Sequence, residues 1–127
     1  IGDLGAKDSS SAHLGPVARW VLERGIPLET SPSSNLQTGA VEAWGSSMSD
    51  HPFDALYRLG FAVTVNSDNR LMSATTLTRE LGLLVEAFGY SIEDLLAFQL
   101  TAAQAAFLDW GQTEEVIDIL LEAYTPR

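Results

Sequence analysis

The stretch AVTVNSDNRLMS, residues 62–73, decides how this chain folds. Its first residues are apolar or β-branched, which is typical of a strand that is covered on both faces. The polar residues that follow place Asp68 and Asn69 in a loop, and we expect a helix beyond it that is capped by Ser73 and ends at Gly89. The apolar stripe of this expected helix consists of Leu77, Leu81, Leu84, Val85 and Phe88. In proteins that alternate strands with helices, the loop after a strand often carries the functional side chains.

The segments on either side of this stretch predict more helices and one more strand. Residues 30–49 are loop-like in composition, with a single helical turn at 40–44 as an alternative. The remaining expected elements are a helix from Pro16 to the left-handed cap Gly25, a strand at 26–29, a short helix capped by Asp50 that carries Phe53 and Leu56, a strand at 61–65, a helix from the Ser91–Asp94 capping box to about Leu108, and a last helix that starts at Thr113.

The order of these elements predicts the topology. Two strands joined by a crossover helix should lie parallel, because a short hairpin cannot connect them. Two parallel strands do not make a buried sheet by themselves, and a complete (β/α)₈ TIM barrel takes about 250 residues. We therefore expect an α/β chain, residues 1–127, that forms the last two strands and terminal helices of a barrel. The first residue, Ile1 instead of Met, also favours a fragment.

Composition limits the possible partners. The chain has 17 acidic and 7 basic residues and a formal net charge of -10, which would repel a nucleic-acid backbone. It has no Cys, so a disulfide framework and a thiolate metal site are excluded, and a cytoplasmic location is the default expectation. No apolar run approaches the roughly 20 residues of a membrane span, so we expect no membrane partner. A neutral small molecule remains the best-fitting class of ligand.

Residues 62–73, together with LETSPSSNLQTG at residues 28–39, resemble the C-terminal part of an adenosine deaminase of the bacterial type, a metal-dependent amidohydrolase. The resemblance extends from Leu14 to about Tyr124, whereas residues 1–13 match poorly. Ser31 stands where many relatives have Cys, but the following Pro-Ser-Ser-Asn pattern is intact. The resemblance implies a zinc-dependent hydrolase that converts adenosine and water to inosine and ammonia.

The resemblance also assigns roles to single residues. Asp68 matches the carboxylate that completes the zinc site, and a carboxylate oxygen suits zinc, which makes its bound water acidic. Asn69 matches a position that hydrogen-bonds the purine ring. The loop residues Ser33, Ser34 and Asn35, with Thr38, would supply hydrogen bonds around the metal. Taken alone, Asp68 is more simply an Asx-turn or capping residue, and Asn69 a turn residue.

Most of the metal site of that family has no match in this sequence. The family needs a His-x-His, a later His, a His-Ala-Gly-Glu and a Gly-His-Gly, and neither His13 nor His51 resembles a ligand. We therefore expect the isolated chain to be inactive and to need an upstream half of the barrel as its partner. Two alternatives stay open: an inactive deaminase-like chain that serves as a binding or interaction protein, and a sister enzyme that acts on another purine.

Overall fold

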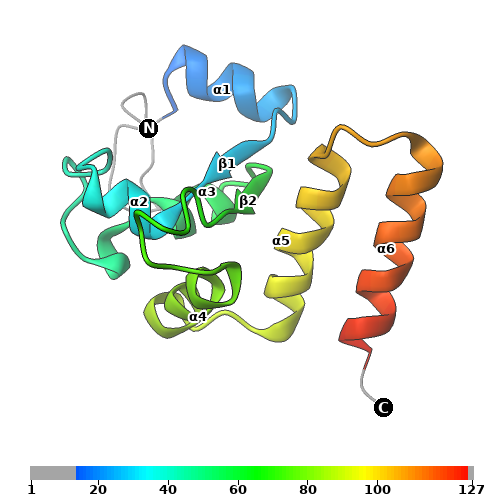
Figure 1. The fold of residues 1–127 in the computed structure, drawn as a ribbon. Helices are drawn as coiled ribbons and strands as arrows, with labels where there is room; N and C mark the ends of the chain where they lie inside the picture. Colours follow the sequence, from blue (N-terminus) through cyan, green and yellow to red (C-terminus); the bar gives the residue numbers. More distant parts are fainter. Residues whose placement is uncertain (1–13, 126–127) are drawn as a thin grey trace.

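Two short strands lie among seven helical segments in residues 14–125, the part of the chain that the computed structural model describes (Figure 1). The segment 1–13, expected to match poorly and containing His13, lies outside the described residues. The elements are α1 (Pro16–Glu23), β1 (Leu28–Thr30), α2 (Pro32–Gln37), the 3₁₀ helix η1 (Met48–Asp50), α3 (Phe53–Arg58), β2 (Val63–Val65), α4 (Leu77–Phe88), α5 (Ile92–Ala105) and α6 (Trp110–Tyr124). No helix within residues 14–125 is long and apolar enough to cross a membrane.

β1 and β2 pair in parallel, as the order of elements predicted. Leu28 lies opposite Val63 and Thr30 lies opposite Val65, and the crossover between the strands contains α2, η1 and α3. Both strands are shorter than the expected 26–29 and 61–65, because pairing begins only at Leu28, opposite Val63. β1 also runs one residue beyond its expected end, to Thr30. The carboxyl ends of the two strands therefore meet at one edge of the sheet, where α2 follows β1 and a loop follows β2.

An aromatic core packs against β2 and fixes α3, α4 and α5 around it. The rings of Phe53 and Phe98 meet edge to face, with centroids 5.1 Å apart. Tyr90 packs against both, and its hydroxyl donates to Asp54 at 2.9 Å. α6 lies along α5 (Figure 1). The buried cluster consists of Phe53, Leu56, Phe61, Val63, Val65, Leu84, Tyr90 and Phe98.

Several local signals were predicted correctly. Gly25 and Gly89 have φ angles of 59° and 71°, the left-handed conformation that glycine adopts most readily at a helix end. The capping box at α5 is also confirmed, because the Ser91 hydroxyl accepts from the Asp94 amide at 3.3 Å while the Asp94 carboxylate accepts from the Ser91 amide at 2.9 Å. In each case the signal lies within a few residues of the feature it specifies.

The prediction that residues 30–49 form a loop is wrong near its start, where α2 is a helix of six residues, and at its end, where η1 begins at Met48. Pro32 occupies its first turn, and Asn35 Oδ1 accepts a hydrogen bond from the Ser31 amide at 3.3 Å. Ser and Asn have low helix propensity, so the composition indicated a loop. Residues 40–44 form successive turns and no helix.

Three predicted helix starts are also corrected. α4 begins after Thr76, whose hydroxyl accepts from the Arg79 amide at 3.2 Å, and Ser73 lies in the preceding loop. Asp109, three residues before Gln112, caps α6, so that this helix starts before Thr113. Asp50 ends η1 and does not cap α3. In addition, α5 ends at Ala105, before the expected Leu108.

His51 joins α2 to α3. Its side chain is buried, and Nδ1 accepts a hydrogen bond from the Phe53 amide at 3.1 Å. The proton of the neutral ring is therefore on Nε2, which donates to Asn35 Oδ1 at 3.3 Å. Burial lowers the pKa of His51 from 6.5 to about 4, and the negative charge of Glu80 opposes this shift in part. His51 is thus a neutral capping residue at ordinary pH.

We predict that this buried histidine makes the fold sensitive to acid. The unfolded chain takes up a proton near pH 6.5 while the folded protein resists it down to about pH 4. The stabilisation is therefore complete above pH 6.5 and is lost as the pH falls from 6.5 to 4, by up to about 3 kcal/mol. Urea denaturation at a series of pH values measures this loss.

The control is His51→Gln, which cannot titrate. Its free energy of unfolding should be nearly flat between pH 6.5 and 4.5, above the range in which most carboxylates titrate. Equal pH slopes in the two proteins over that interval would show that His51 is not the group responsible.

Candidate functional site

Asp68 lies in the loop that follows β2, at the carboxyl edge of the sheet. Its φ of 53° is left-handed, a conformation that Asp tolerates better than most residues. Ser34, from the helix that follows β1, donates its hydroxyl to Asp68 Oδ2 at 2.6 Å. The structure therefore brings together two of the predicted site residues, which are separated by 34 positions in the sequence.

The surroundings of Asp68 suit a single metal-ligating carboxylate. The residue is exposed, and within residues 14–125 Ser34 provides the one hydrogen bond to its carboxylate. A ligating carboxylate is commonly held by such a hydrogen bond on one oxygen while the other faces the ion. The described residues contain no group of three or more His, Cys, Asp or Glu side chains that could hold a metal. The described part of the chain thus offers one fitting ligand and not a complete set.

Asn69 serves as a turn residue in this structure. Its side-chain Oδ1 accepts hydrogen bonds from the amides of Leu71 and Met72, both at 3.1 Å. This is the local role that Asn commonly has in turns. Its amide Nδ2 forms no hydrogen bond within residues 14–125 and is exposed, so the donor that a purine nitrogen would need is available.

The other predicted loop residues hold α2 in place and do not reach Asp68. Ser33 donates its backbone amide to Glu80 Oε2 at 2.9 Å. Asn35 Oδ1 accepts from Ser31 and from His51. Thr38 closes the helix by donating its hydroxyl to the Ser34 carbonyl at 2.8 Å. Of the three residues Ser33, Ser34 and Asn35, only Ser34 contacts the candidate ligand directly.

Glu80 is the residue of this region that the sequence analysis missed. Its side chain is 1% exposed, although charged side chains are rarely buried without a specific partner. One oxygen accepts from the Ser33 amide and the other from the Thr75 hydroxyl at 2.6 Å. A signal was present in the sequence, since Glu80 lies three residues after Leu77 and four before Leu84, on the apolar stripe of α4.

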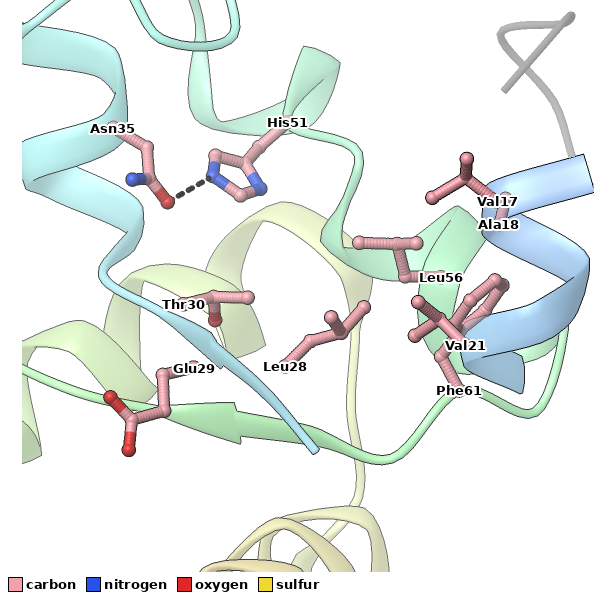
Figure 2. A pocket seen from close by; sticks show the side chains of 10 residues that line it. All are labelled: Val17, Ala18, Val21, Leu28, Glu29, Thr30, Asn35, His51, Leu56 and Phe61. Atoms are coloured by element: carbon pink, nitrogen blue, oxygen red, sulfur yellow. Dashed lines mark hydrogen bonds between the residues drawn. The ribbon is translucent and has the colours of Figure 1, made fainter. Parts of the chain in front are cut away.

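A separate cavity of about 220 Å³ lies between α1, β1 and α3 (Figure 2). Its walls are mainly apolar, and His51 and Asn35 lie at one end, joined by their hydrogen bond. Asp68 and Asn69 are not among the residues that line it. The apolar lining residues are Val17, Ala18, Val21, Leu28, Leu56 and Phe61. This cavity offers no metal ligand set and is not the candidate site.

Comparison with known proteins gives consistent matches. The family model described as adenosine deaminase matches residues 11–123. An adenosine deaminase of Mycobacteroides abscessus is 46% identical over 122 residues, covering 96% of this chain and 33% of that protein. Adenosine deaminase 1 of Streptomyces coelicolor is 42% identical over 125 residues, covering 98% of this chain and 31% of that protein. The chain thus spans about a third of the length of the curated relatives it matches.

A solved structure shares the fold. The crystal structure of adenine deaminase from Arthrobacter aurescens superposes with a TM-score of 0.76 at 21% identity, covering 83% of this chain and 31% of that one. The family match includes both strands, α2 and the Asp68 loop. The resemblance seen in residues 28–39 and 62–73 is therefore confirmed, and the chain belongs to the adenosine deaminase family.

Proposed function

We propose that this chain is the C-terminal section of a zinc-dependent adenosine deaminase, which hydrolyses adenosine to inosine and ammonia. In this proposal β1 and β2 are the last two strands of a (β/α)₈ barrel, and α4 to α6 are its terminal helices. The observation that carries the proposal is the 2.6 Å hydrogen bond between Ser34 and Asp68, formed where two adjacent parallel strands end. Barrel enzymes build their active sites at that edge.

Asp68 would hold the zinc ion, together with histidines from an upstream section of the protein. When bound, the ion would supply a Lewis acid that makes water reactive near neutral pH. The Ser34 hydroxyl fixes one oxygen of Asp68 and so sets the direction of the other. The general acid that protonates the purine ring would also come from the upstream section.

Asn69 would bind the substrate. Its Nδ2 amide can donate to an unprotonated ring nitrogen, while its Oδ1 keeps the turn through Leu71 and Met72. Ser33 and Asn35 support the site indirectly by anchoring α2. A neutral nucleoside is compatible with the net charge of -10, and we place the enzyme in the cytoplasm as the default for a chain without Cys.

A sister purine deaminase is the second candidate, favoured by the fold that this chain shares with an adenine deaminase. The identity of 21% in that comparison supports the fold alone, whereas the matched adenosine deaminases are 42% and 46% identical. Assays of the full-length protein with adenosine and with adenine, side by side, separate the two substrates. If the full-length protein prefers adenine, adenine and not adenosine is its substrate.

We predict that variants of Asp68 and Asn69 in the full-length protein have different effects. Asp68→Ala should lose zinc and most turnover, because it removes a ligand. Asn69→Ala should keep zinc and weaken substrate binding, since losing a hydrogen bond to an uncharged ring costs on the order of 1 kcal/mol, about fivefold to tenfold in affinity. Metal analysis followed by kcat and KM at fixed pH measures both effects.

Asn69→Asp separates binding from turn formation, because an ionised carboxylate can still accept from the amides that follow but has no proton to donate. We expect Asn69→Asp and Asn69→Ala to raise KM alike. A defect confined to Asn69→Ala would assign Asn69 to the turn only. If Asp68→Ala keeps full zinc occupancy and normal turnover, Asp68 is not a metal ligand and serves only as a turn residue.

We also predict that the purified 127-residue chain does not deaminate adenosine. Catalytic zinc sites usually have three protein ligands, and the described residues contain no group of three His, Cys, Asp or Glu side chains that could hold a metal. Addition of the upstream section should restore ammonia release. Chelator-sensitive conversion of adenosine by the short chain alone would contradict this prediction. A stable association with another protein, and no activity in the full-length protein, would favour the binding or interaction role.

A further inference from the structure

The buried carboxylate of Glu80 touches both segments that build the candidate site. Oε2 accepts from the Ser33 amide, in the first turn of α2 and next to Ser34. Oε1 accepts from the hydroxyl of Thr75, at the end of the loop that contains Asp68. With 1% of its surface exposed, Glu80 has no competing contact with solvent. One side chain of α4 thus connects the start of α2 with the loop that contains Asp68.

α2 depends on such outside partners. A helix of six residues is too short to be stable alone, and the Ser31 side chain makes no capping hydrogen bond. The Ser33 amide is one of the first amides of the helix, which have no partner within it. Glu80 satisfies this donor, and its negative charge is favourable at a helix N-terminus. The place of Ser34 in α2 is therefore fixed in large part by Glu80.

The same carboxylate also fixes the Asp68 loop. Thr75 is buried, and its amide donates to the Arg70 carbonyl at 3.3 Å, which closes the turn that begins after Asp68. Removal of Glu80 would take its acceptor from the half-buried Ser33 amide, and would leave the buried Thr75 hydroxyl with the Thr76 carbonyl at 3.4 Å in place of the 2.6 Å bond. Losing these acceptors is unfavourable, so both segments should move.

We propose that Glu80 is a positioning residue of the metal site, acting through Ser34 on Asp68. Its carboxylate sets the position of α2 relative to the Asp68 loop, and that position aims the Ser34 hydroxyl at Asp68 Oδ2. The part of this inference that concerns metal rests on the proposed function. The part that concerns the geometry of α2 does not.

The test uses Glu80→Leu and Glu80→Gln in the full-length protein. Leu fills the space but accepts no hydrogen bond. Gln can accept from Ser33 with its carbonyl and donate to the Thr75 oxygen with its amide, so it should restore the geometry without the charge. Glu86→Gln is the matched control, because Glu86 is an exposed glutamate of the same helix.

For Glu80→Leu we expect zinc affinity, measured by competition with a chelator, to fall about tenfold. Deuterium exchange of the peptide that covers α2 should become faster by about tenfold, and kcat should fall with KM little changed. Glu80→Gln should stay within about threefold of the unchanged protein in each measurement, and Glu86→Gln should not differ from it. Unchanged zinc affinity and unchanged exchange in Glu80→Leu would overturn the proposal.

A double mutant tests whether Glu80 acts through Ser34. Ser34→Ala should also lower zinc affinity, and Glu80→Leu combined with Ser34→Ala should lower it no further than the larger single effect. If the two losses of zinc affinity multiply in the double mutant, Glu80 acts independently of Ser34 and supports folding generally. This result would overturn the positioning role. Should Glu80→Leu not fold, Thr75→Val removes one of the two hydrogen bonds, and zinc affinity should fall about threefold. No fall in Thr75→Val would count against the proposal.

Failure of the proposed function gives a different pattern. If Asp68→Ala keeps its zinc, the metal is bound elsewhere, and the metal part of this inference fails with the proposed function. Faster exchange of α2 in Glu80→Leu would still support the geometric part. If Asp68→Ala loses zinc while Glu80→Leu keeps it, the proposed function stands and the role of Glu80 is refuted.

Discussion

Three residue pairs join β1 to β2 in parallel, and the hydrogen bonds at their carboxyl ends fix the register. The Thr30 hydroxyl donates to the Thr64 carbonyl at 2.7 Å, and the backbone amide of Asn66 donates to the Thr30 carbonyl at 2.8 Å. A slip of one residue would turn Val63 and Val65 out of the core. This constraint places the start of α2 beside the Asp68 loop, so every contact of the candidate site follows from it.

The helices around the strands transmit that constraint to the site. Phe98 of α5 packs against Phe53 of α3, so that α5 contacts both β2 and the crossover. α4 carries Leu84 into the same core and, one turn earlier, Glu80 to α2 and the Asp68 loop. The apolar face and the buried carboxylate of α4 therefore act together, because burial of Leu84 fixes where Glu80 can reach.

Features that depend on neighbouring residues could be predicted from the sequence, and features that depend on distant partners could not. Gly25, Gly89 and the Ser91–Asp94 box specify their helix ends locally, and the crossover order specified parallel strands. α2 was missed because its stability comes from Glu80, 47 positions from Ser33, and from His51. The Asp68 loop was found through its resemblance to a family, but nothing local indicated that Ser34 would reach Asp68 and that Ser33 and Asn35 would not.

Asp68 and Asn69 were interpreted either as turn residues or as a metal ligand and a substrate-binding residue. Both interpretations require the same loop geometry. Asn69 Oδ1 closes the turn on Leu71 and Met72, and this turn holds the left-handed backbone of Asp68 next to it. A residue that is strained in this way persists only when its surroundings determine it, and such residues gather at functional sites. The turn fixes the backbone of Asp68, Ser34 fixes its carboxylate, and Glu80 fixes the segments that carry both. A carboxylate whose backbone and side chain are both held in place loses little freedom when it binds a metal, and this is the physical argument for the metal role that we propose for Asp68.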